Sequence, residues 1–398
     1  MAVVLAGIGA FLNLNATQPI LPLFAELFSA SKSAVGMTVS ATMIGVVFSA
    51  PFCGVLAERL GRKRVILYAM TLLAFPTMLT ATSGSLNALI MWRFLQGIVI
   101  PGVFGVVVAY ITEEWPAWNV VKVVSYYVSG TVLGGFIGRV LVGYSSTHAI
   151  VPGVAPSWRV GFVTIGILDL IFAAIILRWL PPDSKGLERA TPASLQGRTL
   201  QHLRNPQLVA TYAVGFNVLF SLAAIFTYIN FVLADAPYFW NPAQLSYLFV
   251  VYLVGLVVTP FGGTWISKVG SRLGLIVAML VAMAGVTLTL VHSALAILLG
   301  LVLCCTGVFI CQCSASSYLQ TAAPAGERAS AAGLYVAFYY LGGSLAGVLP
   351  GYVWRFGGWT ACVILVLLIQ ITAIFIAAAA WKQKAEASAS QLPTEQFE

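Results

Sequence analysis

Three ionisable side chains lie deep inside long apolar stretches of the sequence: Arg93, Arg139 and Asp169. In the hydrocarbon region of a membrane, such a group costs about 2.5 to 3.5 kcal/mol on insertion scales, so it normally faces a cavity or a partner. One carboxylate near two guanidinium groups can form a charge cluster that changes state when the carboxyl group binds a proton. The sequence therefore predicts a proton-coupling role for these residues, with Glu26 near the outer end of the first apolar run as a fourth candidate.

Each of these side chains also has a simpler interpretation. Arg139 could extend to the outer lipid headgroups or bind an anionic ligand, and Arg93 could donate hydrogen bonds to backbone carbonyls. Asp169 could be a static partner at a helix surface. The residue types alone leave these alternatives open.

The composition places these residues in a membrane protein. Of the 398 residues, 60% are hydrophobic and only 8% are charged, whereas soluble domains carry about 25% charged residues. A spanning helix needs about 20 apolar residues, and the chain has twelve such runs. We therefore predict an all-α membrane protein with twelve transmembrane helices, at about 2–24, 34–57, 65–82, 86–111, 122–145, 158–180, 207–232, 244–265, 273–291, 294–319, 329–352 and 359–380.

The distribution of charge gives an orientation. The net charge is +8, but the basic residues gather in alternate loops rather than in a nucleic-acid-binding patch, and by the positive-inside rule these loops are cytoplasmic. Both termini are then cytoplasmic, and lipid is the expected surrounding. Residues 1–24 lack a basic start and contain Asn13, Asn15 and Gln18, so they are predicted to be the first spanning helix and not a cleaved signal.

An internal repeat divides the chain into two six-helix halves. Residues 54–67 align with 263–276, and 133–144 align with 341–352, at nearly equal shifts of 209 and 208 residues. Parallel six-helix repeats with a central site between them build one large group of transporters. The predicted parts are an N-terminal bundle (1–180), a polar cytoplasmic linker (181–206), a C-terminal bundle (207–381) and a cytoplasmic tail (382–398).

Three short motifs resemble those of the major facilitator superfamily. "GVLAERLGRK", beginning at Gly54, resembles the loop signature between helices two and three, with Glu58 in place of the usual Asp. "RFLQG" (93–97) resembles the helix-four motif, and "GTVLGGFIG" (130–138) resembles the glycine-rich helix-five motif associated with antiporters. Segments 228–255 and 333–344 are similar to the drug-efflux and arabinose-efflux-permease-like branch of bacterial inner-membrane carriers. The resemblance implies a role for Arg93 in proton transfer.

The same analysis proposes gating and pocket residues. Gating is assigned to two groups, a cytoplasmic loop latch and a glycine stripe that lets helices slide: Gly54, Glu58, Arg59, Gly61 and Arg62, and Gly130, Gly134 and Gly138. A substrate pocket combines apolar walls with a few polar groups. The candidates are Asn13, Gln18, Tyr127, Asn217, Tyr228, Asn230, Tyr252, Gln312, Tyr335 and Tyr339.

We predict a monomeric secondary transporter that exports a small organic compound in exchange for protons by alternating access. The sequence contains no nucleotide-binding loop and no enzyme signature, and His148, His202 and His292 are dispersed. We therefore expect no enzyme activity, cofactor or resident metal. The alternatives are an importer or facilitator that binds an anion at Arg139, a receptor without transport, and a copper carrier. The last would use Cys304, Cys305, Cys311 and Cys313, which are otherwise small buried apolar residues.

Overall fold

The structure, a computed structural model, describes residues 1–183, 201–324 and 327–381. Most of the predicted linker (184–200) and the predicted tail (382–398) lie outside these residues. Within the described ranges the chain is helical and has no strand. Its elements are α1 (Ala2–Leu14), η1 (Gln18–Ile20), α2 (Leu21–Leu27), α3 (Lys32–Leu60), α4 (Arg62–Thr80), α5 (Leu86–Val99), α6 (Pro101–Glu114), α7 (Ala117–Ser145), α8 (Trp158–Trp179), α10 (Pro206–Ala234), α11 (Pro242–Tyr247), η2 (Leu248–Leu253), α12 (Val254–Val269), α13 (Ser271–Leu288), α14 (Ala294–Ala322), α15 (Arg328–Ala346) and α16 (Leu349–Ala380).

The predicted fold class is confirmed, because every predicted apolar run coincides with helical structure. Among the described residues, ten helical segments are long and apolar enough to cross a membrane. The other two runs correspond to α4, which begins with three basic residues, and to α15, which is rich in Gly, Ser and Tyr. Gly357 and Gly358 interrupt α16, and Gly358 has a positive φ of 58°. The residues before this kink continue the eleventh predicted run, and those after it form the twelfth.

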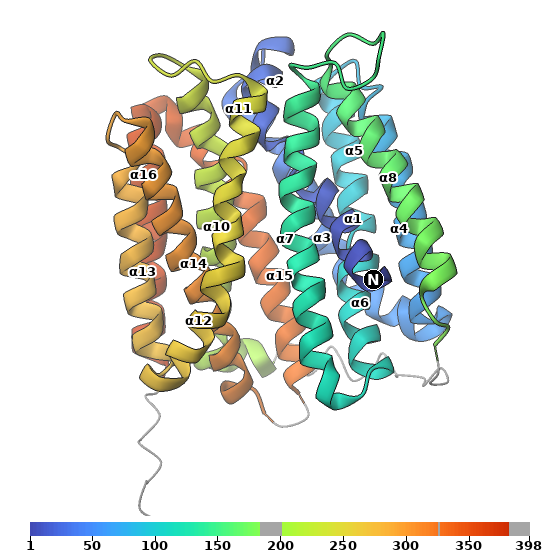
Figure 1. The fold of residues 1–398 in the computed structure, drawn as a ribbon. Coiled ribbons are helices and arrows are strands. Elements are labelled where there is room, and N and C mark those ends of the chain that lie inside the picture. Colours follow the sequence, from blue (N-terminus) through green and yellow to red (C-terminus); the bar gives the residue numbers. More distant parts are fainter. Residues whose placement is uncertain (184–200, 325–326, 382–398) are drawn as a thin grey trace, which may run out of the picture.

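The first apolar run is not one helix, which differs from the continuous helix expected over 2–24. Helix α1 ends at Leu14, and helical structure resumes at Gln18 in η1. Pro19 lies in η1 and lacks the backbone N–H that would donate to the carbonyl oxygen of Asn15 in a continuous α-helix. Figure 1 shows the start of α1 at mid-height of the bundle. The break therefore leaves carbonyl groups of α1 without helical partners inside the protein.

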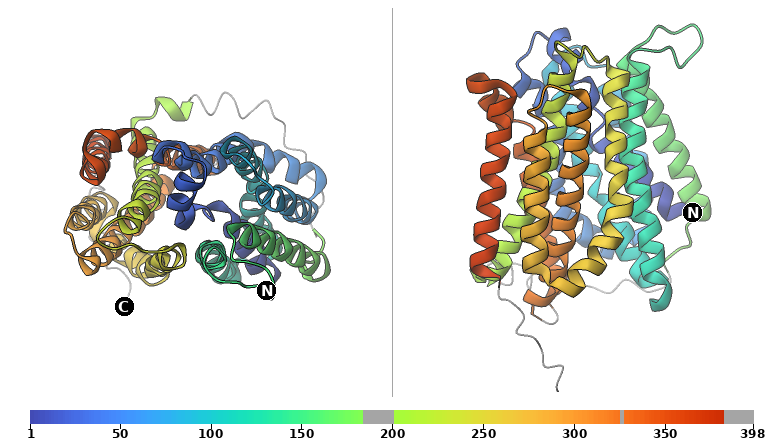
Figure 2. Two further views of the ribbon diagram at one scale, coloured as in Figure 1. Left: turned by 90° about the horizontal axis from the view of Figure 1, so that it is seen from above. Right: turned by 60° about the vertical axis from the view of Figure 1, so that its left-hand side comes forward.

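The two halves lie side by side (Figures 1 and 2) and repeat the same local geometry. Gly61, between α3 and α4, has φ 90° and ψ 142°, and Gly270, between α12 and α13, has φ 87° and ψ 150°. This region of backbone space is open essentially to glycine alone. Pro51 and Pro260 lie inside α3 and α12 at the same shift of 209 residues. The structure thus agrees with the repeat read from the sequence.

Candidate functional site

Arg93 stabilises the break in the first run. Its side chain is fully buried, and its Nη1 and Nη2 donate to the carbonyl oxygens of Asn13 and Leu14, each at 2.7 Å. Its Nε donates to the carbonyl oxygen of Thr38 on α3 at 3.1 Å. Leu14 is the last residue of α1, so the helix end leaves its carbonyl oxygen without a partner in the helix, whereas the carbonyl oxygen of Asn13 also accepts from the backbone N–H of Ala16 at 3.4 Å. The guanidinium group therefore joins α5 to α1 and α3 through the backbone.

A chain of side-chain hydrogen bonds leads from Arg93 to Asp169. Arg93 Nη1 donates to Gln96 Oε1 at 2.5 Å, and Gln96 Nε2 donates to Thr77 Oγ1 at 2.9 Å. Thr77 Oγ1 donates to Asn13 Oδ1 at 2.6 Å, and Asn13 Nδ2 donates to Asp169 Oδ2 at 2.8 Å. Asp169 is fully buried, and within the described residues its Oδ1 has no hydrogen-bond partner. A polar network thus replaces the expected direct charge cluster.

Arg139 lies at the joint between the halves. It is only 3% exposed, so it does not extend to the headgroups. Its Nε donates to Gln18 Oε1 at 2.8 Å, and its Nη1 donates to the carbonyl oxygen of Gly135 at 2.7 Å. The guanidinium carbon lies 4.4 Å from the ring centroid of Phe249 and 4.9 Å from that of Tyr252, both in the C-terminal half. Such cation–π contacts stabilise a guanidinium group away from water.

Gln18 connects these two arrangements. It accepts from Arg139 on α7, and its Nε2 donates to Thr227 Oγ1 on α10 at 3.1 Å. Gln18 begins η1, immediately beyond the break whose other side carries Asn13. The short break in the first run is therefore flanked by Asn13, which belongs to the Asp169 network, and by Gln18, which bridges the halves.

The halves also meet where α3 packs against α15, toward the upper end in Figure 1. Ser40 donates to the carbonyl oxygen of Ser344, and the Tyr228 hydroxyl donates to the carbonyl oxygen of Gly347 at 2.7 Å. A Cβ atom added at Gly347 would lie 2.2 Å from Ser40 Oγ and 2.7 Å from the carbonyl oxygen of Gly36. This contact therefore requires glycine.

A matching contact joins α7 to α11. A Cβ atom at Gly143 would lie 2.6 Å from the carbonyl oxygen of Pro242 and 2.5 Å from Ser246 Cβ. Its counterpart at a shift of 208 residues, Gly351, approaches Ser33 equally closely. The two halves are thus sealed at one end by two pseudo-symmetric contacts.

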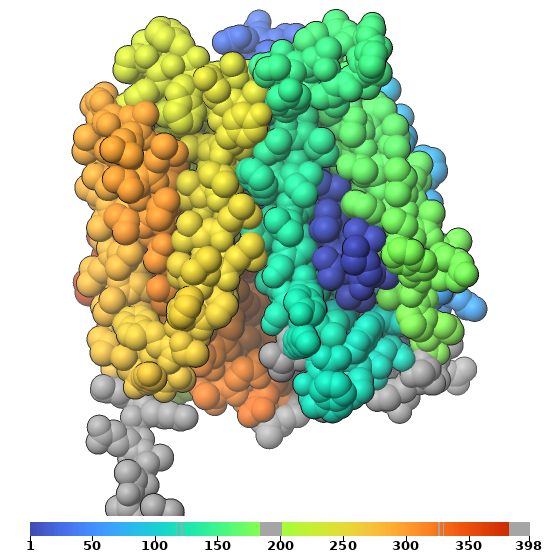
Figure 3. Space-filling view, viewed as in Figure 1, coloured from blue at the N-terminus to red at the C-terminus, as the bar shows by residue number. Residues whose placement is uncertain are grey.

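The opposite end is open. Figure 3 shows the halves touching in the upper part of one face and parting below, where α15 lies behind the opening between α12 and α7. Five glycines toward this end have no neighbouring atom within 4 Å of an added Cβ atom: Gly54, Gly105, Gly263, Gly270 and Gly333. The repeat-related Phe52 and Phe261 are 72% and 71% exposed. On this face, the halves thus lie farther apart toward the end that carries Gly61.

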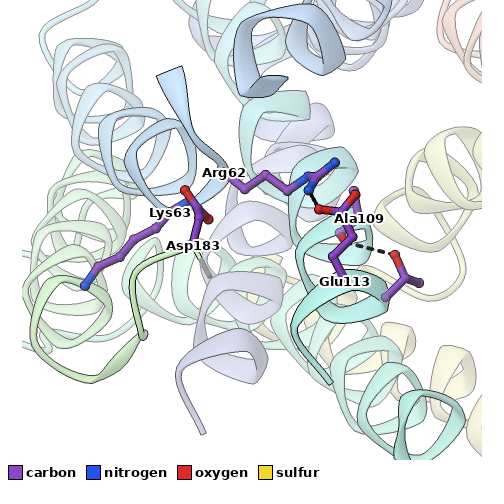
Figure 4. Close-up of polar contacts among 6 residues, drawn as sticks. Arg62, Lys63, Ala109, Glu113 and Asp183 are labelled. Carbon is purple, nitrogen blue, oxygen red and sulfur yellow. Dashed lines mark hydrogen bonds and ion pairs between the residues drawn. The ribbon is translucent and has the colours of Figure 1, made fainter. Parts of the chain in front are cut away.

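The loop signature makes ion pairs other than those expected (Figure 4). Arg62 pairs with Glu113 at the end of α6, and the backbone N–H of Lys63 donates to Asp183 Oδ1 at 3.2 Å. Asp183 thereby caps the start of α4. Glu58 is half-buried and Arg59 is exposed, and Glu58 has no ion pair within 4 Å in the part of the chain that the structure describes. The Arg62–Glu113 ion pair lies within the N-terminal half, and neither contact latches the two halves.

The glycine stripe faces a different neighbour from the one expected. An added Cβ atom at Gly130, Gly134 or Gly138 would lie within 2.8 Å of the carbonyl oxygens of Val4, Ile8 or Leu12. The stripe therefore packs α7 against α1 of its own half and not against the opposite half. The repeat-related position of Gly134 is Gly342, which likewise packs on the backbone of Phe216 in its own half. Gly343 and Gly347, which follow on α15 and at its end, face α3 across the joint.

One pocket candidate of the C-terminal half contacts Arg139, and three others contact one another. Tyr252 stacks beneath its guanidinium group. On neighbouring helices, the Tyr335 hydroxyl donates to Gln312 Oε1 at 2.7 Å, and the Tyr335 and Tyr339 ring centroids are 6.3 Å apart. These aromatic and amide groups lie on elements of the C-terminal half.

Other candidates serve different contacts. Asn217 contacts Met279 Sδ at 3.3 Å inside the C-terminal half, and Asn230 donates to Phe226 of its own helix at 2.5 Å. Tyr228 donates to the carbonyl oxygen of Gly347 at the end of α15, and Tyr127 donates to the carbonyl oxygen of Phe104 at 3.2 Å. Glu26 is exposed in α2, apart from the buried network. These five residues therefore lie outside the arrangement around Arg139.

The cysteines of α14 do not converge on a common point. Cys304, Cys305 and Cys311 are buried, and the Cys311 and Cys313 thiols are directed to different carbonyl oxygens, those of Leu275 and Thr259. Across the described ranges, no group of three or more His, Cys, Asp or Glu side chains could hold a metal ion.

Sequence analysis missed four polar or aromatic members of the site: Thr77, Gln96, Thr227 and Phe249. Gln96 had a usable signal, because it lies three residues after Arg93 on the same helix face. The other three carried none, since a Thr or Phe in an apolar run is common on any helix face.

Two repeated helical halves, sealed at one end and open at the other around buried polar groups, define a membrane transporter. Residues 3–347 match the Major Facilitator Superfamily, as do residues 240–397. The chain belongs to this superfamily, whose members are transporters and not enzymes. It is 29% identical to an uncharacterized transporter of Buchnera aphidicola subsp. Schizaphis graminum, over 94% of this chain and 89% of the relative.

Two further comparisons agree with this assignment to a transporter superfamily. The chain is 29% identical to the inner membrane transport protein YnfM of Escherichia coli, over 94% of this chain and 88% of the relative. Its fold is similar to the crystal structure of a bacterial homologue of the human lysosomal transporter Spinster. The TM-score is 0.74 and the identity 14%, over 95% of this chain and 94% of that one.

Proposed function

We propose that this protein is a proton-coupled secondary transporter of the bacterial inner membrane that exports a small organic compound by alternating access. The observation that carries the proposal is the buried Asp169 carboxylate, whose Oδ1 has no partner in the described residues. A carboxyl oxygen of this kind can bind and release a proton. The inner-membrane location rests on the similarity to the transport protein of Escherichia coli.

The arrangement supplies a path from protonation to movement of the halves. Asp169 accepts a hydrogen bond from Asn13 at the end of α1, and the break that follows carries Gln18, which contacts Arg139 and Thr227. Proton uptake removes the negative charge that Asn13 faces, so the position of the break can change. A shift of Gln18 then alters a contact that both halves share.

Substitution of Asp169 with Asn tests this coupling. Asn has nearly the same shape but cannot exchange a proton at neutral pH, so we expect pH-gradient-driven transport to be lost while substrate exchange without a gradient persists. A compound that raises thermal stability in a screen of metabolites and antibiotics would serve as substrate in liposomes. Glu26→Gln, at an exposed carboxylate of α2, is the control. Retention of gradient-driven transport by Asp169→Asn would refute the proposal.

A second candidate, uptake or facilitated passage of an organic anion, is favoured by the surroundings of Arg139. Among the described residues no carboxylate pairs with it within 4 Å, and its Nη2 makes no hydrogen bond. A free donor edge beside two aromatic rings suits a carboxylate or another planar anion. Right-side-out vesicles with acid outside distinguish the candidates, because proton exchange expels the substrate whereas proton symport accumulates it.

Arg139 is expected to be essential under either candidate. Arg139→Ala should abolish transport without removing folded protein from the membrane. Arg139→Lys should retain only part of it, because an ammonium group keeps the charge but loses the planar fork. Arg355→Ala, beside Tyr352, is the control and should transport normally. Wild-type flux by Arg139→Ala would show that the side chain is only a packing element.

A further inference from the structure

A groove on the outer surface of the N-terminal half is separate from the site above. It lies between α4 and α8, which run side by side at one edge of the molecule (Figures 1 and 2). Its volume is about 480 Å³, and its walls come from residues 67–72 of α4 and 170–177 of α8. This volume is within the range of about 300 to 1,000 Å³ typical of small-ligand sites.

The lining of the groove suits a hydrocarbon chain. Apart from Tyr68 and Thr71 it is apolar, and the Thr71 hydroxyl already donates to the carbonyl oxygen of Leu67 at 2.9 Å. Ala173 and Ala174 provide the room, because their short side chains lie among leucines. At 1.5 Å per residue, residues 170–177 cover about 10 Å along the helix.

Two arginines stand at one end of this groove. Arg64 is three residues before Leu67, and Arg178 is four residues after Ala174, so each shares a helix face with the lining. Both side chains are exposed, and neither has an ion-pair partner within 4 Å among the residues that the structure describes. The neighbouring Arg62, in contrast, is paired with Glu113.

Trp179 indicates the level of the membrane surface at this end. It is 59% exposed and follows Arg178 directly, and tryptophans gather where lipid headgroups meet the hydrocarbon region. The arginines therefore lie at headgroup level with the apolar groove below them. Basic pockets between transmembrane helices bind anionic lipid headgroups.

We propose that this groove binds one anionic phospholipid, with an acyl chain along α4 and α8 and the headgroup phosphate between Arg64 and Arg178. The phosphate accepts hydrogen bonds from two guanidinium groups, and the chain fills the space beside Ala174.

Native mass spectrometry of the full chain in detergent tests the proposal with phosphatidylglycerol and phosphatidylcholine of identical acyl chains. The wild-type protein should retain phosphatidylglycerol preferentially. Arg64→Gln and Arg178→Gln should each reduce the preference about fivefold, which corresponds to about 1 kcal/mol for each basic residue. Ala174→Phe, which fills the groove from an exposed position, should reduce retention of both lipids.

The matched control is Arg272→Gln at the start of α13, the counterpart of Lys63 in the repeat. An equal loss in Arg272→Gln would overturn the proposal in favour of general charge attraction. Equal retention of the two lipids would also overturn it, as would equal competition by soluble glycerol phosphate, which would indicate a simple anion site. A dimer that Ala174→Phe disperses would assign the groove to a second copy of the chain. Thermal unfolding of each variant without added lipid verifies folding.

Discussion

At the scale of single residues, the chain keeps two buried guanidinium groups without a carboxylate partner for either among the described residues. Arg93 distributes its donors over carbonyl oxygens at a helix break and over Gln96. Arg139 instead combines two hydrogen bonds with two aromatic faces. All three nitrogens of Arg93 bond to backbone carbonyl oxygens, which suits a structural joint, whereas Nη2 of Arg139 makes no hydrogen bond within the described residues, which suits a ligand.

Arg93 should therefore affect stability more than Arg139 does. Hydrogen bonds inside membrane proteins contribute about 0.6 kcal/mol on average and at most about 1.7 kcal/mol. Arg93→Met removes four of them, so we expect a loss of about 2 to 4 kcal/mol, measured as thermal unfolding in detergent. Arg159→Met, which removes bonds to the carbonyl oxygens of Ala81 and Ser83, should cost about half as much. Equal unfolding temperatures for wild type and Arg93→Met would contradict this account.

At the scale of helices, glycines decide which end of the molecule can close. Backbones touch at the sealed end because Gly36 and Gly347 have no side chains, whereas Gly54 and Gly333 at the open end have nothing beside them. Small residues allow this close approach of helices in membranes. A larger side chain at one of these glycines should thus oppose the helix contact that forms at that position.

Gly347→Leu should open the sealed end. Its side chain would collide with Ser40 and the backbone of Gly36, so the equilibrium should shift toward the opposite arrangement. Spin labels on cysteines introduced at Ser29 and Phe239, both outward of the seal and exposed, would report a longer distance. Gly54→Leu is the control, because it meets no atom in the present arrangement and should leave this distance unchanged. The account fails if Gly347→Leu gives the wild-type distance.

The helices could be placed from the sequence more readily than their rotations. Apolar length locates a spanning segment, and the shift of 209 residues correctly related Gly61 to Gly270. In a bilayer, however, lipid-facing and buried helix faces are both apolar. The pattern therefore did not reveal that Gly138 packs on α1 or that Asn217 faces Met279.

At the scale of the whole molecule, the two halves are related but not equivalent. A shift of 208 residues relates Gly143 to Gly351, and both make close contacts at the sealed end. The same shift relates Arg139 to Gly347. One joint is thus closed by a bare backbone contact and the other by a guanidinium group that contacts two aromatic rings. Charge is confined to one of two symmetric positions, so the joint at α7 is the one suited to respond to an ionic ligand.

The positive-inside rule predicts that the turn at Gly61, and with it the open end, faces the cytoplasm. The matched substitutions Ser267→Cys and Ser293→Cys test this orientation. Both serines are exposed, and they lie on either side of α13. In a background with the partly exposed Cys53 and Cys313 replaced by Ala, a membrane-impermeant maleimide should label Ser293→Cys in intact cells and Ser267→Cys only in inside-out vesicles. The reverse pattern would make the present arrangement outward-facing, and Asp169 would then exchange its proton from the other side of the membrane.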